Sequence, residues 1–165
     1  MKLNVQIDSD RAQQAFAKAP DVMRRSLDRY IDRAAHEVAR EARRRAPKAF
    51  STLTNSINVH RGGLYLREHQ ISRVIAPSVN YAAFVEGGAR PHRPGPRNGL
   101  AEWVKLKFGG SAKEQRDRTF LIGRAIAKRG TRAQPFMRPA AEKMESRVIA
   151  LLREGVDAGI REILG

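Results

Sequence analysis

The sequence predicts an α+β fold, in which a small, mostly antiparallel sheet packs against a long helix in the N-terminal half and a long helix at the C-terminus. Apolar residues recur with the helical period over 20–46 and again over 139–164, which is typical of helices with one buried face. Between them, 57–77 alternates apolar and polar side chains, as strands with one covered face do. Further helical patterns predict extra helices inserted after the sheet. The 165 residues fit a single domain spanning 1–165.

The first part of the chain predicts a strand followed by two helices. Residues 1–8 alternate apolar and polar side chains, which indicates a half-buried strand. The polar residues at 8–10 offer N-cap oxygens for a short helix through Phe16. Pro20 stands where a longer helix is expected to begin, because a proline at the first helical position loses no backbone hydrogen bond. Pro47 predicts the end of that helix at Ala46.

The outer face of this long helix is mostly arginine, and its last turn contains Arg43, Arg44 and Arg45. Cations in a last turn suit the helix dipole, so a solvated charged face is one interpretation. The alternative is that the surplus of arginine meets an anionic surface, with these three residues facing DNA. The net charge of +15 favours polyanions in general and indicates no sequence specificity.

The middle of the chain predicts two or three antiparallel strands and then a short helix. Gly62 and Gly63 indicate a tight turn between strands, and Pro77 follows the last of them. In the stretch 78–88, Tyr81 and Phe84 share one face of a short helical turn, which predicts an aromatic pair packed on the core.

The second half predicts a loop and three helices. Prolines and arginines at 88–98 exclude a helix or a central strand and predict an exposed, mobile loop. A helical elaboration is expected over 98–130, with Asn98 as the cap of its first helix, Gly109-Gly110 as the end of that helix and Gly130 as the end of the second. The last helix is expected to start with Pro139 in its first position.

No catalytic, cofactor-binding or metal-binding pattern appears in the sequence. His36-Glu37 begins like a zinc-protease helix, but the second ligand position is Arg40 and the motif fails. The absence of cysteine excludes disulfides and thiolate metal sites. No apolar run approaches the roughly 18 residues of a membrane span, and no signal-peptide pattern begins the chain. We therefore expect a non-enzymatic, soluble protein made and used inside a cell, with no cofactor.

Two short blocks in the second half carry a family resemblance. Residues 134–139 read Gln-Pro-Phe-Met-Arg-Pro, an extended clip in which Pro135 and Pro139 flank Phe136, a predicted buried peg. Residues 80–88 read Asn-Tyr-Ala-Ala-Phe-Val-Glu-Gly-Gly. Together they resemble the tailed-bacteriophage tail-component family, whose members act in head–tail joining, as neck or tail-completion proteins. A third block at 42–57 is similar but degraded, because serine or threonine stands near the family's glycine.

The resemblance implies a virion structural protein of the head–tail junction, in the neck or at the tail terminus. It implies a ring of six subunits around the DNA channel, between head-connector and tail-tube proteins, assembled in the host cytoplasm. On this interpretation packaged DNA is a non-specific contact, and the subunit or partner interface comprises Tyr81, Glu86, Arg90 and Arg93. The alternative is a stand-alone basic protein that binds nucleic acid without sequence preference through its arginine face.

Overall fold

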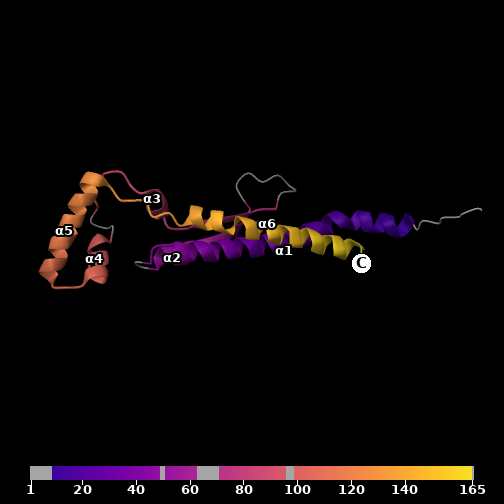
Figure 1. Cartoon of the computed structure of the whole chain (residues 1–165), viewed down its shortest axis with the longest axis horizontal. Coiled ribbons are helices and arrows are strands. Elements are labelled where there is room, and N and C mark those ends of the chain that lie inside the picture. Colours follow the sequence, from indigo (N-terminus) through magenta and orange to yellow (C-terminus); the bar gives the residue numbers. More distant parts are fainter. Residues whose placement is uncertain (1–8, 49–50, 63–70, 96–98, 165) are drawn as a thin grey trace, which may run out of the picture. The chain divides into compact units, whose positions relative to one another are not determined.

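The computed structural model describes residues 9–48, 51–62, 71–95 and 99–164, and it has an α+β fold (Figure 1). Within these ranges lie helices and one two-stranded antiparallel sheet of β1 and β2. The predicted strand at 1–8 and the predicted turn residue Gly63 lie outside the described residues. In chain order the elements are α1 (Ser9–Arg45), α2 (Thr52–Ser56), β1 (Ile57–Arg61), β2 (Arg73–Pro77), α3 (Ala82–Gly87), α4 (Leu100–Phe108), α5 (Ala112–Arg129) and α6 (Met137–Leu164).

The chain clusters into two compact units, to which both long helices contribute. The first unit comprises Met1–Glu37, Val59–Val74 and Met144–Gly165. The second comprises Val38–Asn58 and Ile75–Lys143.

Helix α1 runs without interruption from Ser9 to Arg45, so the prediction that Pro20 begins a separate helix was wrong. A proline inside a helix removes one backbone hydrogen bond, but Pro20 is exposed on the surface and the helical pattern continues on both sides of it. The predicted end of the helix is confirmed, because Ala46 is the first residue beyond α1.

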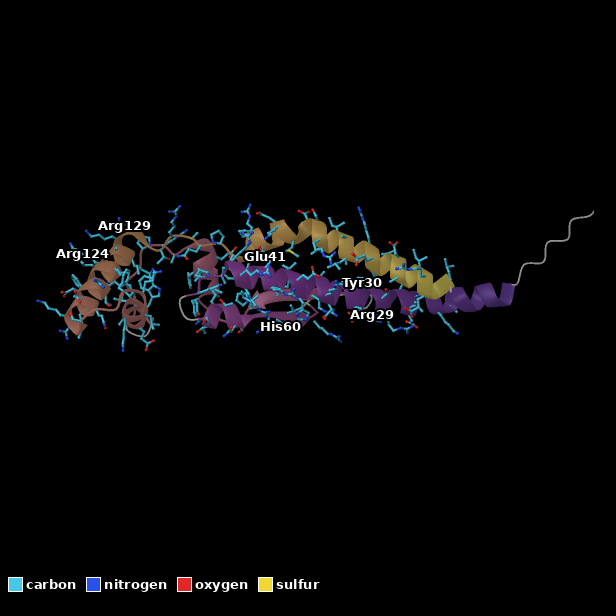
Figure 2. All side chains as sticks on the ribbon, turned by 60° about the horizontal axis from the view of Figure 1, so that its bottom comes forward. Arg29, Tyr30, Glu41, His60, Arg124 and Arg129 are labelled. Carbon is cyan, nitrogen blue, oxygen red and sulfur yellow. The ribbon has the colours of Figure 1, made fainter. Side chains whose placement is uncertain are left out.

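In the first unit, α6 approaches α1 closely because two glycines face α1. A side chain at Gly155 would place its Cβ 2.9 Å from the Cβ of Tyr30, and one at Gly159 would lie 2.8 Å from the sulfur of Met23. Ser26, fully buried, donates a hydrogen bond of 2.8 Å to the carbonyl oxygen of Gly155. Figure 1 shows α6 alongside α1, and Figure 2 labels Tyr30 on α1. The two glycines thus allow a close approach of the helix backbones, and this approach brings the buried Ser26 hydroxyl within hydrogen-bond distance of a carbonyl oxygen.

The first residue of β2, Arg73, is anchored to α1 by ion pairs with two half-exposed aspartates. The Arg73 guanidinium, 4% exposed, donates to Asp28 Oδ1 at 2.6 Å and to Asp32 Oδ1 at 2.8 Å. The hydrogen bond from Arg73 holds the pKa of Asp32 below its usual value. Because the two aspartates are one helical turn apart, one arginine can bind both and set the position of the strand on the helix.

In the second unit, the end of α1 packs around apolar and charged contacts. Leu53 of α2 and Ile57 of β1 are buried. Arg43 donates from Nε to the carbonyl oxygen of Ile57 at 3.1 Å, which ties the start of β1 to α1. The buried Glu41 accepts hydrogen bonds from Lys143 and Arg45, and these donors lower its pKa. Figure 2 labels Glu41 on α1.

The predicted aromatic face of α3 is turned outward, so that prediction was wrong. Tyr81 is 40% exposed and Phe84 is 61% exposed. The inward positions are instead Ala82, which is buried, and Val85 and Glu86, which are half-buried at the following i+3 and i+4 positions. The register differs from the prediction by one residue because a glutamate, not an aromatic ring, is bonded inside the fold.

Two helix starts also differ from the predictions, and the start of α5 was not predicted. Helix α4 begins after Gly99, and the predicted cap Asn98 lies outside the described residues. Helix α5 begins at Ala112, well before its apolar positions, because Ser111 and Glu114 form a capping box. Helix α6 begins at Met137, two residues before the predicted Pro139. The ends of α4 and α5 at glycines, which were predicted, are confirmed.

Candidate functional site

Two segments that carry the family resemblance meet in the second unit. Residues 85–89, at the end of α3, lie against 130–138, at the start of α6; we call these two segments the clasp. Ala89 and Thr131 exchange two backbone hydrogen bonds of 2.9 and 3.1 Å in an isolated antiparallel bridge. The Gln134 amide donates to the carbonyl oxygen of Val85 at 2.8 Å.

The carboxylate of Glu86 caps the first turn of α6. Its Oε2 accepts from the amides of Phe136 and Met137 at 2.7 and 2.9 Å, and its Oε1 accepts from the amide of Arg138 at 3.0 Å. The first amides of a helix have no partner within the helix, and the positive end of the helix dipole favours an anion there. A side chain that is 50 residues distant in sequence from Phe136 therefore performs the task of an N-cap.

The protonation of Glu86 is shifted by two opposing effects. Burial raises the pKa, but the backbone amides of Phe136, Met137 and Arg138 lower it, and the result is a pKa below the usual glutamate value. The capping charge is thus maintained at neutral pH.

Two glycines allow the segments of the clasp to approach each other. A Cβ at Gly130 would lie 1.9 Å from the carbonyl oxygen of Ala89, and one at Gly88 would lie 2.7 Å from that of Thr131. Both glycines also have positive φ, +75° and +77°, which other residues rarely adopt. The pair of backbone bonds between Ala89 and Thr131 depends on these two positions.

Phe136 is the buried peg of the clasp. Its side chain is completely buried, as is Ala140 one turn later, and this confirms the predicted burial. Pro135 is exposed, and Pro139 is the third residue of α6, where a proline costs no helical hydrogen bond. The ring and the Glu86 cap together position the first turn of α6.

An open, mostly apolar hollow borders the clasp within the second unit. It is lined by Pro47, Lys48, Leu53, Tyr81, Val85, Trp103, Leu106, Lys107 and Gln134. Tyr81 and Leu106 are 40% and 67% exposed, so their apolar surface is available to another molecule. Two lysines and a tyrosine hydroxyl supply polar groups at the same place. Such a hollow can hold side chains of a partner protein, and its described lining includes no carboxylate or histidine.

The four predicted interface residues do not form one site. Tyr81 lines the hollow, whereas Glu86 is turned into the protein as a helix cap. The interface role predicted for Glu86 stays a prediction, and its carboxylate already has three donors within the chain. Arg90 and Arg93 are exposed on the irregular segment after the clasp, and Arg93 lines a separate groove with α4 and α5. The predicted mobility of 88–98 remains a prediction, and 96–98 lie outside the described residues.

The three arginines predicted to face DNA have different environments. Arg43 is half-buried and bonded to Ile57, so its side chain has a structural task, and the predicted DNA contact of this residue stays a prediction. Arg44 and Arg45 are 70% and 36% exposed, and both pair with Glu41. Arg44 retains most of its surface for another anion. Arg40 is also exposed and makes no ion pair with the described residues.

Sequence reasoning missed Glu86 as a cap, although a signal was present. The residues directly before α6 include no serine, threonine, aspartate or asparagine, so the first amides of α6 need an acceptor from elsewhere. Glu86 is the single acid in the block 80–88 of a very basic chain. The pairing of these two observations could have indicated the contact.

Among the described residues, no three acidic or histidine side chains gather closely enough to hold a metal ion. None of the helices in the described part of the chain is long and apolar enough to cross a membrane. No protein-family model matches the chain, and neither a curated protein nor a solved structure matches it.

Proposed function

We propose that the chain is a structural protein of a tailed-bacteriophage head–tail junction, acting in the neck or in tail completion. One observation supports this above the others: the two sequence blocks that resemble the family are bonded to each other through Glu86 and the amides of Phe136, Met137 and Arg138. Blocks that are separate in sequence are thus parts of one structural device. Because the two blocks form one contact, their joint resemblance to the family has a single structural explanation.

The proposal includes a ring of subunits, with six as the expected number, between head-connector and tail-tube proteins. The hollow beside the clasp is the proposed partner surface, because Tyr81, Trp103 and Leu106 line it and the two most exposed of these leave apolar area uncovered. The net charge of +15 makes non-specific contact with packaged DNA an electrostatic consequence of this location.

The test is complementation of a phage that lacks its own copy of this protein. Replacing Tyr81 and Leu106 together with serine is expected to leave DNA-filled heads and separate tails, which electron microscopy counts. Phe84→Ser is the matched control, because Phe84 is 61% exposed and does not line the hollow. Normal particles with the double variant, or equal defects with both, would contradict the proposal.

The alternative, a stand-alone basic nucleic-acid-binding protein, is favoured by the exposed arginines of α1. Replacing Arg40 and Arg44 with glutamine tests it, since neither is bonded to the backbone as Arg43 is. Each lost phosphate contact should reduce the salt slope of duplex binding by about 0.9. If this variant loses every function while the Tyr81/Leu106 variant completes particles, the nucleic-acid-binding function replaces the head–tail one.

A further inference from the structure

Helix α5 is a helix without a buried side. None of its residues from Ala112 to Arg129 is buried, although it contains Phe120, Leu121, Ile122 and Ile126. Phe120 is 67% exposed and Leu121 is 61% exposed. Helices in proteins derive most of their stability from packing an amphipathic face, and among the described elements α5 packs mainly against α4. Figure 1 shows this pair side by side; we call it the helical arm, residues 100–129.

The exposed apolar surface of the arm forms a groove with cations at its edge. The groove is lined by Arg93, Pro94, Gly95, Leu100, Ala101, Thr119, Phe120, Gly123, Arg124 and Ala127. Arg124 also lines a second, shallower hollow with Leu121, Ala125, Lys128 and Arg129. Figure 2 labels Arg124 and Arg129 on α5. Phe120, Arg124 and Lys128 follow one another at helical i+4 spacing, so one aromatic ring and two cations lie along one row.

The charge of the arm is unbalanced. It contains eight lysines and arginines against three acids. Of the three acids, Glu114 is occupied in the capping box with Ser111. Arg124 makes no hydrogen bond or ion pair with the described residues. The cations at the groove are therefore available to carboxylates from another molecule.

We infer that the helical arm binds an acidic, apolar-faced segment of a different protein, with Phe120 and Arg124 as its central contacts. The apolar lining provides burial for leucine-like side chains, and the cations at the edge select carboxylates. This inference concerns a surface apart from the clasp and its hollow, and it does not depend on the head–tail proposal.

Two other occupants fit the arm less well. Duplex DNA would satisfy the cations but would leave Leu100, Phe120 and Ala127 without apolar contact, since phosphates and sugars dominate its surface. A second copy of this chain is poorly suited, because most of its described carboxylates are already engaged by its own cations or amides. Those engaged are Asp28, Asp32, Glu37, Glu41, Glu86, Glu114, Glu142, Glu154 and Glu162.

The experiment begins with a displayed library of random peptides of about 16 residues, or about 24 Å of helix, selected against the full-length protein. We expect the selected peptides to be rich in glutamate or aspartate and in large apolar residues. The dissociation constant of the tightest peptide is then measured by fluorescence anisotropy on the wild type and on variants.

Phe120→Ser and Arg124→Glu are each expected to raise the dissociation constant of that peptide by about tenfold or more, as the loss of a central interface contact does. Arg153→Glu is the control for net charge, since Arg153 is an exposed arginine on α6 without an ion pair in the described residues. Circular dichroism checks that each variant retains the wild-type helix content. A short duplex DNA is measured in parallel at the same salt concentration.

The inference is supported if binding depends on Phe120 and Arg124 and not on Arg153. It is overturned if no acidic apolar peptide is selected, or if Phe120→Ser leaves the affinity unchanged. It is also overturned if duplex DNA binds more tightly than every peptide and loses affinity equally with Arg124→Glu and Arg153→Glu, since that result would indicate charge alone.

Discussion

Helices α5 and α6 are both amphipathic, both capped by a glutamate and both contain glycine, yet only α6 has buried residues. Helix α6 buries Ala140, Leu151, Gly155 and Gly159, whereas α5 buries no residue. Their caps also differ, because one comes from a local residue and the other from a distant one. Glu114 caps α5 from within its own first turn, and Glu86 caps α6 from 50 residues away.

This difference separates two uses of one local pattern. An amphipathic helix becomes part of a core when another segment of the chain packs against its apolar face. In the first unit, α1 packs against α6 in this way. Where no such segment packs against the helix, its apolar and basic side chains stay exposed, as in the helical arm. Three matched pairs of variants compare the two helices directly.

The largest difference is expected between Phe136, directly before α6, and Phe120, within α5. Phe136→Ala should reduce the free energy of unfolding by about 3–5 kcal/mol, because it removes a fully buried ring and leaves a cavity. Phe120→Ala should change it by less than about 0.5 kcal/mol, since its ring is 67% exposed. Denaturant unfolding of both variants measures this. Equal losses would show that the arm is packed, and the contrast between α5 and α6 would fail.

The glycines are expected to respond with opposite signs. Gly155→Ala places a methyl group 2.9 Å from the Cβ of Tyr30, so the helices must separate at a cost of about 1–3 kcal/mol. At Gly123, the nearest atom to an added Cβ is 3.7 Å away, on Leu100, which is ordinary contact. Gly123→Ala should therefore stabilise α5 by up to about 1 kcal/mol through helix propensity. Thermal unfolding measures both changes, and a stabilising Gly155→Ala would disprove the close approach of α6 to α1.

The smallest difference concerns the capping glutamates. Glu86→Gln removes the charge that accepts from three amides of α6 and should cost about 0.5–2 kcal/mol at neutral pH. Glu114→Gln should affect only the first turn of α5, because its partner Ser111 is local. Amide hydrogen exchange distinguishes the two: α6 should lose protection in the first variant alone.

The pH dependence of Glu86 follows from the direction of its pKa shift. Its folded-state pKa lies below the usual glutamate value, so the unfolded chain binds the proton more tightly. Its contribution to stability is therefore complete above about pH 4.3, the usual unfolded value, and is lost as pH falls through the lower folded pKa. The stability difference between wild type and Glu86→Gln should shrink on acidification from pH 7 to about pH 3. A difference that stays constant would show that the charge is not what caps the helix.

Much of the candidate site could be predicted from the sequence as segments, though not as contacts. Both segments of the clasp were identified as blocks, and the burial of Phe136 was predicted from its place between two prolines. The inward face of α3 was predicted with the wrong residues, because the spacing of Tyr81 and Phe84 fits a helix face regardless of which face is buried. Glu86 was assigned to an interface and not to the helix cap, since its partners are the amides of a helix that starts much later in the chain.

The sequence by itself determined the α+β class, the helical stretches, and the ends of α1, α4 and α5, because each depends on residues within a turn or two of the position concerned. Only the tertiary structure decided that Pro20 stays inside α1, that Ser26 meets Gly155 across 129 residues, and that Glu86 caps α6. Those outcomes depend on which segments distant in sequence lie next to one another in the fold. Periodicity shows that a helix has a face to bury, but only the arrangement of distant segments determines whether that face is covered, as in α6, or left open, as in α5.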